Sequence, residues 1–171
     1  MFNFTELDPK EFHQSPFKLI GDDWMLVTAQ KDHKANTMTA SWGGLGIMWG
    51  KNVAFIVLRP QRYTKTFVDH SDEFSLSFFD DSFKKTLSYL GSVSGRDEDK
   101  ISKSNLTLVQ QDNVPYFEEA KITIFCKKLY AQKFEPDCIL DKEICGKWYP
   151  DKDYHTMYVG EITKILVKNE K

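Results

Sequence analysis

Two long strand-like runs near the end of the chain constrain its fold more than any other feature. Residues 122–134 and 157–167 are each longer than a typical strand of about 5–6 residues. Strands of this length suit a small barrel, in which they must bend as the sheet curls. Gly160 lies inside the second run, where it makes room for a kink or a bulge.

The rest of the pattern predicts shorter strands and a few short helices. Strands are expected over residues 17–20, 24–29, 36–42, 53–58 and 74–79, and helices over residues 8–14, 64–70, 82–91 and, as helix or loop, 137–149. The glycines of residues 43–46 are expected in a bend, and residues 92–105 in a polar crossover, either solvated or held by a ligand. Strands and helices do not alternate regularly, which disfavours a parallel sheet. A mainly β fold follows, and barrel closure is consistent with the pattern.

The segments 36–42 and 59–64 carry the residues best suited to bind a ligand. Hydroxyl and apolar side chains alternate along residues 36–42, so a strand there would carry hydroxyls on one face only. Arg59 and Arg62 follow a buried strand, and guanidinium groups form the paired hydrogen bonds that phosphates favour. Thr64 can cap a helix whose first amides also attract anions. These features predict a place for an anion beside a flat aromatic group.

Four segments, in this order and spacing, resemble the flavin reductase-like, FMN-binding split-barrel proteins, and the flavoredoxin-like branch in particular. They are residues 36–42, 59–64, 72–77 and 94–100, and the similarity extends from about residue 17 to about residue 168. The resemblance implies one domain over residues 1–171, folded as a Greek-key split β-barrel with a few short peripheral helices. It also implies FMN as the cofactor.

The resemblance further implies which residues form the site. In the family, the backbone around residues 36–41 lies along the flavin edge, and residues 94–96 with Lys100 fit a phosphate clamp. His155 lies where it could deliver a proton around neutral pH. The implied cofactor-binding residues are Asn36, Thr37, Met38, Thr39, Ser41, Trp42, Arg59, Arg62, Tyr63, Thr64, Ser94, Gly95, Arg96 and Lys100. The alternative is a set of surface arginines, a core tryptophan, a solvated charged loop and a surface histidine.

Three functions remain open. The first is an FMN-binding oxidoreductase in which NADH or NADPH passes hydride to the flavin, with FMN as either a bound group or a substrate. The second is a flavoredoxin-type electron carrier reduced by a partner protein, and the third is a small-ligand binder without activity. The family resemblance also implies a homodimer.

Composition and motifs exclude several other classes. A net charge of -2 argues against a nucleic-acid partner, and the three arginines, Arg59, Arg62 and Arg96, all fall in the expected phosphate segments. Three cysteines without a Cys-x-x-Cys pair disfavour a disulfide scaffold or a metal site. The glycines of residues 43–46 fail the G-x-G-x-x-G frame, so no Rossmann site is expected. Neither a signal peptide nor a membrane span is visible, so we expect a cytoplasmic protein.

Overall fold

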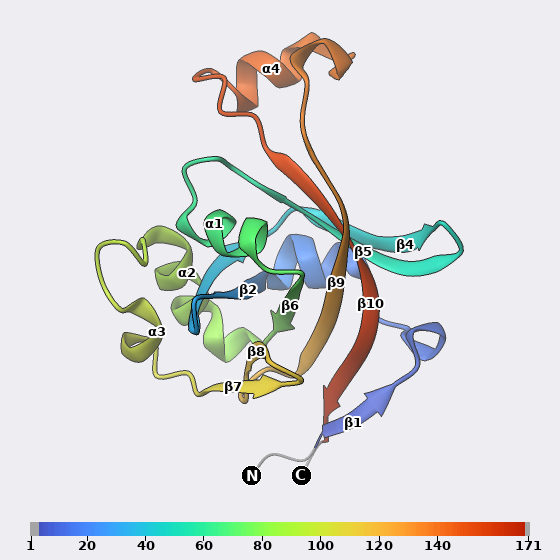
Figure 1. The fold of residues 1–171 in the computed structure, drawn as a ribbon, viewed down its shortest axis with the longest axis vertical. Coiled ribbons are helices and arrows are strands. Elements are labelled where there is room, and N and C mark those ends of the chain that lie inside the picture. The colour runs from blue at the N-terminus through green and yellow to red at the C-terminus, as the bar shows by residue number, and fades with distance from the viewer. Residues whose placement is uncertain (1–3, 170–171) are drawn as a thin grey trace.

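The computed structural model describes residues 4–169 and confirms a mainly β, antiparallel architecture (Figure 1). The main sheet has the order β3-β2-β6-β9-β10-β5-β4, with β1 also paired to β10. Its strands are β1 (Phe4–Leu7), β2 (Met25–Lys31), β3 (Lys34–Ala40), β4 (Gly43–Met48), β5 (Lys51–Leu58), β6 (Glu73–Phe78), β9 (Ile122–Lys133) and β10 (Thr156–Lys168). A separate hairpin pairs β7 (Leu108–Gln111) with β8 (Val114–Phe117).

The two long strands predicted near the end of the chain are β9 and β10, and they organise the sheet. β10 pairs with β9 along one edge and with β5 and β1 along successive parts of the other. The register with β9 shifts between Val159 and Gly160, as the glycine predicted, and again between Ile162 and Lys164. A Cβ added to Gly160 would lie 2.8 Å from that of Cys126. Glycine is therefore required where the two strands bend together.

The helices are short and lie around the sheet. They are α1 (Tyr63–His70), α2 (Lys84–Ser92), α3 (Lys100–Lys103), α4 (Lys142–Trp148), a π-helix (Phe17–Asp23) and 3₁₀ turns at Pro9–Glu11, Asp81–Phe83 and Pro136–Cys138. Among the described residues, no helix is long and apolar enough to cross a bilayer. Residues 135–153, which include α4, stand off the sheet beyond the ends of β9 and β10 (Figure 1). We call them the arm.

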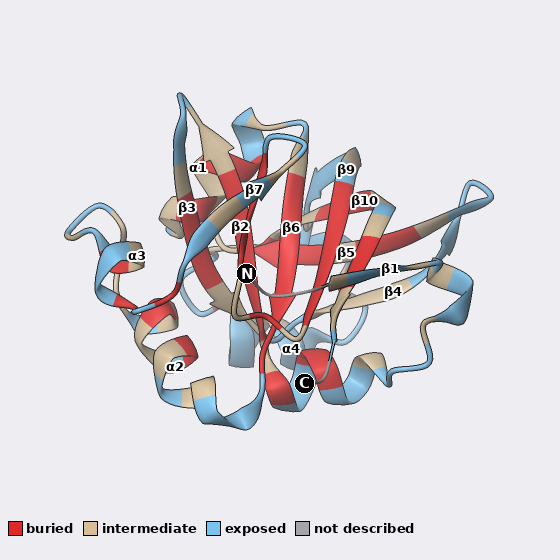
Figure 2. Cartoon of the chain, turned by 90° about the horizontal axis from the view of Figure 1, so that it is seen from below, coloured by how far each residue is buried: buried red, intermediate tan, exposed pale blue. Residues whose placement is uncertain are grey.

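Buried residues run through the strands of the main sheet (Figure 2), and they form clusters on both of its faces. Alternate residues of β2, β5, β6 and β9 pack inward together, and Phe67 and Val68 of α1 complete this main cluster as predicted. On the other face, Leu87 and Leu90 of α2 pack over Leu26 of β2. The β7–β8 hairpin covers a third cluster beside β9. This packing fixes α1 and α2 against β3, where the candidate site is found.

The prediction of a strand over residues 17–20 was wrong, because this segment is a π-helix. Leu19 and Ile20 are both buried, whereas Phe17 is 88% exposed. A strand would place neighbouring residues on opposite faces, so burying two in succession on one core requires a helical path. The chain leaves the helix at Trp24, whose φ of 67° is unusual for a bulky residue.

Three smaller expectations also need correction. The helix predicted over residues 8–14 is only the 3₁₀ turn Pro9–Glu11, capped by Asp8 as expected. The glycines of residues 43–46 do not form a bend but pair with β5 as part of β4. A Cβ on Gly44 would lie 2.4 Å from the Phe55 ring, so small residues are needed for the large ring to cross the strand. The helix predicted over residues 82–91 is α2, which begins at Lys84 without a side-chain cap.

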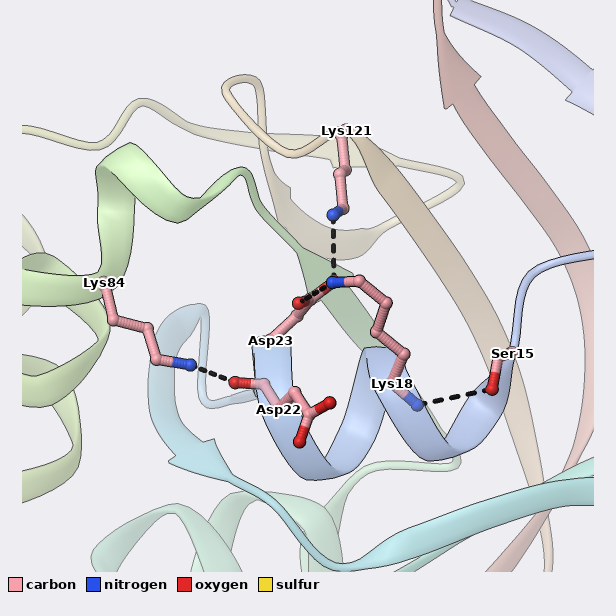
Figure 3. A network of polar contacts seen from close by, with 6 residues as sticks. All are labelled: Ser15, Lys18, Asp22, Asp23, Lys84 and Lys121. Atoms are coloured by element: carbon pink, nitrogen blue, oxygen red, sulfur yellow. Dashed lines mark hydrogen bonds and ion pairs between the residues drawn. The ribbon is translucent and has the colours of Figure 1, made fainter.

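The π-helix is fixed to the sheet by a buried carboxylate (Figure 3). Asp23 accepts hydrogen bonds from the Nζ atoms of Lys18, at 2.6 Å, and Lys121, at 3.1 Å. Burial alone would raise the pKa of Asp23, but the two lysines outweigh it and hold this pKa below its usual value. The neighbouring Asp22 is exposed, and Lys84 contacts only its main-chain oxygen.

Asp23→Asn is expected to lower the free energy of unfolding at pH 7 by about 1.5–3 kcal/mol, because it removes two charge-assisted hydrogen bonds. Asp22→Asn is the matched control and should have little effect, since its main-chain contact remains. The depressed pKa of Asp23 means that its contribution is present above about pH 4 and is lost as the pH falls further. Urea unfolding of both variants at pH 7 and at pH 3 checks this. Equal losses at both pH values would contradict the role of the charge.

Candidate functional site

The turn of residues 59–62, between β5 and α1, joins the two groups that make up the candidate site. The amide of Arg62 closes it by donating to the oxygen of Arg59 at 3.1 Å. The Cα atoms of Arg59 and Arg62 are at most about 11 Å apart, because each of the three residue steps extends the chain by about 3.3–3.6 Å. On one side lies the cation group, Arg62, Arg96 and Lys100. On the other lies the aromatic corner, Trp42, Trp148, Tyr149 and His155.

Arg62 and Lys100 both reach the C-terminal end of α2. Lys100 is only 2% exposed, and its Nζ donates to the oxygens of Leu90 at 2.8 Å and Val93 at 2.9 Å. Arg62 donates to the oxygen of Gly91 at 2.8 Å. The negative end of a helix dipole favours cations, so these contacts explain how two positive side chains are tolerated there.

The charges of Arg62 and Lys100 are not balanced by carboxylates. Burial, together with the charge of Arg62, lowers the pKa of Lys100 to about 8, and burial also lowers the pKa of Arg62. Within residues 4–169, neither side chain forms an ion pair. A buried and a half-buried positive charge that are bonded only to carbonyl oxygens make this part of the molecule attractive to an anion.

Arg96 completes the cation group from the loop between α2 and α3. Its guanidinium lies over the ring of Tyr63, 4.7 Å from the centroid, and donates to the oxygen of Gln61 at 3.1 Å. The amide of Arg96 donates to Oγ of Ser94 at 3.2 Å, which shapes the loop. Arg96 is exposed, so its remaining donors face solvent and are available to a ligand.

Asn36, Thr64 and Gly95 bring β3, α1 and this loop together. Asn36 is buried and donates to Oγ1 of Thr64 at 2.9 Å. A Cβ on Gly95 would lie 2.3 Å from Oδ1 of Asn36, so only glycine lets the loop approach this closely. The expectation that Thr64 caps α1 was wrong, because it is the second residue of the helix and its hydroxyl serves Asn36. Arg62 is the N-cap, without a side-chain hydrogen bond at that end.

A cleft of about 780 Å³ opens between β3, α1 and the loop that leads into α3. It collects five of the residues predicted to bind the cofactor. These are Asn36, Tyr63, Gly95, Arg96 and Lys100. The structure therefore brings together residues that are more than sixty positions apart in the sequence. Ser94 and Arg62, which were also predicted to bind the phosphate, do not line this cleft.

Three acidic residues also line this cleft, and two of them are already engaged. Glu98 pairs with Lys103, which lowers the pKa of Glu98. Asp99 caps α3 by accepting from the amide and hydroxyl of Ser102, and these bonds lower its pKa. Asp97 lines the cleft as well. The attraction for an anion is thus local to the cation group and does not extend to the whole cleft.

The aromatic corner lies at the base of the arm. The rings of Trp42 and Trp148 meet edge to face, with centroids 4.9 Å apart and planes at 81°. Trp42 also lies against His155, with centroids 5.0 Å apart and planes at 35°. The hydroxyl of Tyr149 and Nδ1 of His155 are 2.8 Å apart and share a hydrogen bond.

His155 does not behave as the sequence led us to expect. Burial, with a further contribution from the charge of Arg59, lowers the pKa of His155 to about 4. Its ring is therefore neutral at pH 7 and is not a ready proton source there. The physical reason is that the aromatic packing removes water from the ring and a nearby guanidinium opposes a second positive charge.

Arg59 holds the arm to the rest of the protein. It forms an ion pair with Asp153 and donates to the oxygen of Trp148 at 2.8 Å, and its guanidinium lies 5.2 Å from the centroid of the Tyr149 ring. Gln61 also donates to Asp153, at 2.8 Å. The structure therefore separates Arg59 from the cation group. Sequence reasoning missed these partners because 94 residues separate Arg59 from Asp153, and no local pattern pairs them.

Most of the remaining predicted residues belong to the scaffold of β3. The alternation is confirmed: Met38 packs in the core, whereas Thr37 bonds Thr28 at 2.9 Å and Thr39 donates to the oxygen of Leu87. Ser41 is exposed just beyond the end of the strand. Because β3 lies at one end of the sheet order, its outer edge offers main-chain groups to a ligand.

The described residues offer no group of three or more His, Cys, Asp or Glu side chains in a position to hold a metal ion. The three cysteines are free, and Cys126 is buried in the core. The site thus consists of the cation group, the cleft and the aromatic corner.

Comparison with known proteins relates this arrangement to others. A sequence profile described as "Flavin reductase like domain" matches residues 19–171. A solved FMN-binding domain of a flavin reductases-like enzyme from Shewanella baltica superposes with a TM-score of 0.72 at 16% identity, over 97% of this chain and 78% of that one. Flavoredoxin of Desulfovibrio vulgaris gives a TM-score of 0.66 at 25% identity, over 84% of this chain and 68% of that one.

A further relative, an uncharacterised protein from Archaeoglobus fulgidus, is 25% identical over 134 residues, or 77% of this chain. The chain spans 65% of the length of that relative. The structural matches identify the fold as that of the FMN-binding split-barrel proteins, as the sequence predicted.

Proposed function

Because the chain belongs to the flavin reductase-like family, we propose that it is an FMN-binding oxidoreductase. The observation that supports this most directly is the pair formed by the buried Lys100 and the half-buried Arg62, two cations that have no carboxylate partner among the described residues. A phosphate dianion supplies the missing negative charge. Charge-assisted hydrogen bonds to a phosphate are about twice as strong as neutral ones.

The residues around the cation group fit the rest of the cofactor. Arg96 and the uncapped first turn of α1 offer donors beside Lys100. The outer edge of β3 leads from Asn36 toward Trp42, so its main-chain amides can bond the carbonyl edge of a flavin ring. When bound, FMN would supply the capacity to accept a hydride or single electrons. Fixed amides of this kind would stabilise the negative charge that develops on the reduced ring.

We further propose NADH or NADPH as the reductant. The described strands form antiparallel sheets, so this part of the chain offers no βαβ unit for a second nucleotide. The nicotinamide ring must then approach the flavin within the same site, at about 3–3.5 Å for hydride transfer. An electron carrier reduced by a partner protein is the second candidate, favoured by the similarity to flavoredoxin. NAD(P)H oxidation by the FMN-loaded protein distinguishes the two, since a carrier would show none.

The direct test is FMN binding. After incubation with FMN and desalting, we expect flavin absorbance equivalent to about one flavin per chain. At a hundredfold excess over the dissociation constant, FMN should stabilise the folded protein by about 2.7 kcal/mol. Riboflavin, which lacks the phosphate, is the matched ligand control and should bind more weakly. Unchanged flavin fluorescence and an unchanged melting temperature in micromolar titrations would refute the proposed function.

We also expect a homodimer. The β4–β5 hairpin carries Ile47, Met48 and Trp49 on its exposed end, and Trp49 packs 6.2 Å from the ring of Tyr130 on β9. Monomers rarely expose such a group of large apolar side chains, and a second copy would cover it. Light scattering should give twice the chain mass of 19.9 kDa at micromolar concentration. Trp49→Ser should favour the monomer, and a wild-type mass near 19.9 kDa would contradict the dimer.

A further inference from the structure

The aromatic corner has an open side that the contacts described above do not use. Trp42 is 36% exposed and Trp148 is 41% exposed, although both pack against other rings. Their planes are nearly perpendicular, at 81°. A flat ring can therefore stack on one indole while its edge meets the other, which are the two arrangements that aromatic pairs prefer.

The rings of the corner are held in place before any ligand arrives. Trp42 lies against His155, and His155 is bonded to Tyr149. The main-chain oxygen of Trp148 accepts from Arg59, which itself pairs with Asp153. Binding a ring here would cost little side-chain entropy, because these side chains are already ordered. A lone surface tryptophan would lack this advantage.

The net negative charge of the arm favours an electron-poor ring. The arm, residues 135–153, carries six carboxylates and three lysines. His155 is neutral at pH 7 because burial lowers its pKa to about 4, and the charge of Arg59 is balanced by Asp153. Indole faces attract cations. Lys147 already lies 5.3 Å from the centroid of the Trp148 ring, so a cation is accepted at this face.

We propose that the aromatic corner is a binding site for a cationic, planar heteroaromatic ring of the pyridinium class, stacked on the indole of Trp148 and meeting Trp42 with its edge. The inference deepens the proposed function, because such a ring is the part of an oxidised nicotinamide that leaves after hydride transfer. The assignment of the arm residue Trp148 to this role rests on the geometry of the corner. A ring bound there would displace the ammonium group of Lys147 from the indole face.

The test uses the full chain labelled with ¹⁵N and the probe 1-methylnicotinamide at millimolar concentration. The four tryptophans give four indole signals, identified by single Trp→Phe variants. The signals of Trp42 and Trp148 should shift with the probe, whereas those of Trp24 and Trp49 serve as internal controls and should not. Cyclohexanecarboxamide, which has no aromatic ring, should leave all four unchanged. The titration is repeated with one equivalent of FMN, where binding should persist.

Two variants sharpen the result. Trp148→Ala should lower the affinity for the probe roughly two- to thirtyfold, the range expected for one cation–π contact. Lys147→Ala should instead raise the affinity for the probe, because a competing cation is removed. Lys142→Ala is the matched control and should leave the affinity unchanged, since Lys142 lies on the same arm but bonds Pro136. Weaker binding by Lys147→Ala would show that Lys147 supports the bound ring and does not compete with it, which would overturn the proposal.

Other outcomes also overturn it. Unchanged Trp42 and Trp148 signals at saturating probe would exclude the site, and signals that follow protein concentration but not probe would show that a second copy covers the corner. Loss of probe binding on addition of FMN would mean that the flavin itself occupies the corner. FMN titration of wild type and of Trp148→Ala distinguishes failure of the ring site from failure of the proposed FMN binding. If wild type and variant both fail to bind FMN while the probe still shifts the wild-type signals, only the proposed function fails.

Discussion

Replacing Arg96 with alanine is expected to weaken FMN binding by roughly ten- to a hundredfold while affecting riboflavin much less. The reason is that FMN carries the phosphate dianion and riboflavin does not. Losing a charge-assisted hydrogen bond in such a site costs about 1.5–3 kcal/mol, and each 1.4 kcal/mol is a factor of ten. Arg96 is exposed and has no ion-pair partner among the described residues, so its removal should not disturb folding.

The comparison of the two ligands is what makes this experiment decisive. Lys103→Ala removes the same charge from the same segment, but Lys103 is paired with Glu98, so FMN affinity should change little. Fluorescence titration of both variants with both flavins at constant ionic strength gives four dissociation constants, which are compared with those of the wild type. If Arg96→Ala weakens FMN and riboflavin equally, then Arg96 supports the site through Tyr63 and does not contact the phosphate.

The parts of the fold that were predictable depend on local patterns. The length of β9 and β10 and the position of Gly160 predicted a bent, bulged pair of strands, and this is what forms. The alternation around Met38 predicted which face of β3 enters the core. Helix α1 followed from its apolar spacing. In each case, the side-chain period of a strand or a helix determines the result, and the period is visible in the sequence.

The parts that were missed depend on contacts between distant segments. Residues 17–20 have the composition of a strand, but the core requires Leu19 and Ile20 side by side and so imposes a helix. The different contacts of the two arginines also depend on distant segments. The two arginines lie three residues apart in the sequence. Arg59 nevertheless pairs with Asp153, whereas Arg62 donates to the end of α2. Only the folded chain determines which arginine remains available to an anion.

Lys100 should make FMN affinity depend on pH in a range where few other groups titrate. In the free protein its pKa is lowered to about 8, because burial disfavours the charged form and Arg62 repels it. A bound phosphate dianion would favour the charged form and raise this pKa. Below pH 8 the lysine is already charged, so binding is strongest there. As the pH rises through 8, binding must take up a proton, and affinity should fall by up to tenfold per unit.

Other ionisable groups near Lys100 should not produce this change. Arg62 stays charged, and the pKa values of Glu98 and Asp99 are lowered by their partners, far from the range concerned. The phosphate itself titrates near pH 6, so measurements belong between pH 7 and 9.5. Lys100→Met keeps most of the length of the side chain without the charge.

We therefore expect the Lys100→Met variant to bind FMN roughly ten- to a hundredfold more weakly at pH 7, and with an affinity that no longer changes between pH 7 and 9.5. Because the variant also loses the hydrogen bonds from Lys100 to the oxygens of Leu90 and Val93, its free energy of unfolding should fall by about 1–3 kcal/mol, and thermal unfolding without ligand checks that it is still folded under the assay conditions. Riboflavin, which has no phosphate, should show little pH dependence with either protein. A wild-type affinity for FMN that stays constant across this range would mean that Lys100 does not face the phosphate. Its buried charge would then serve only to cap the end of α2.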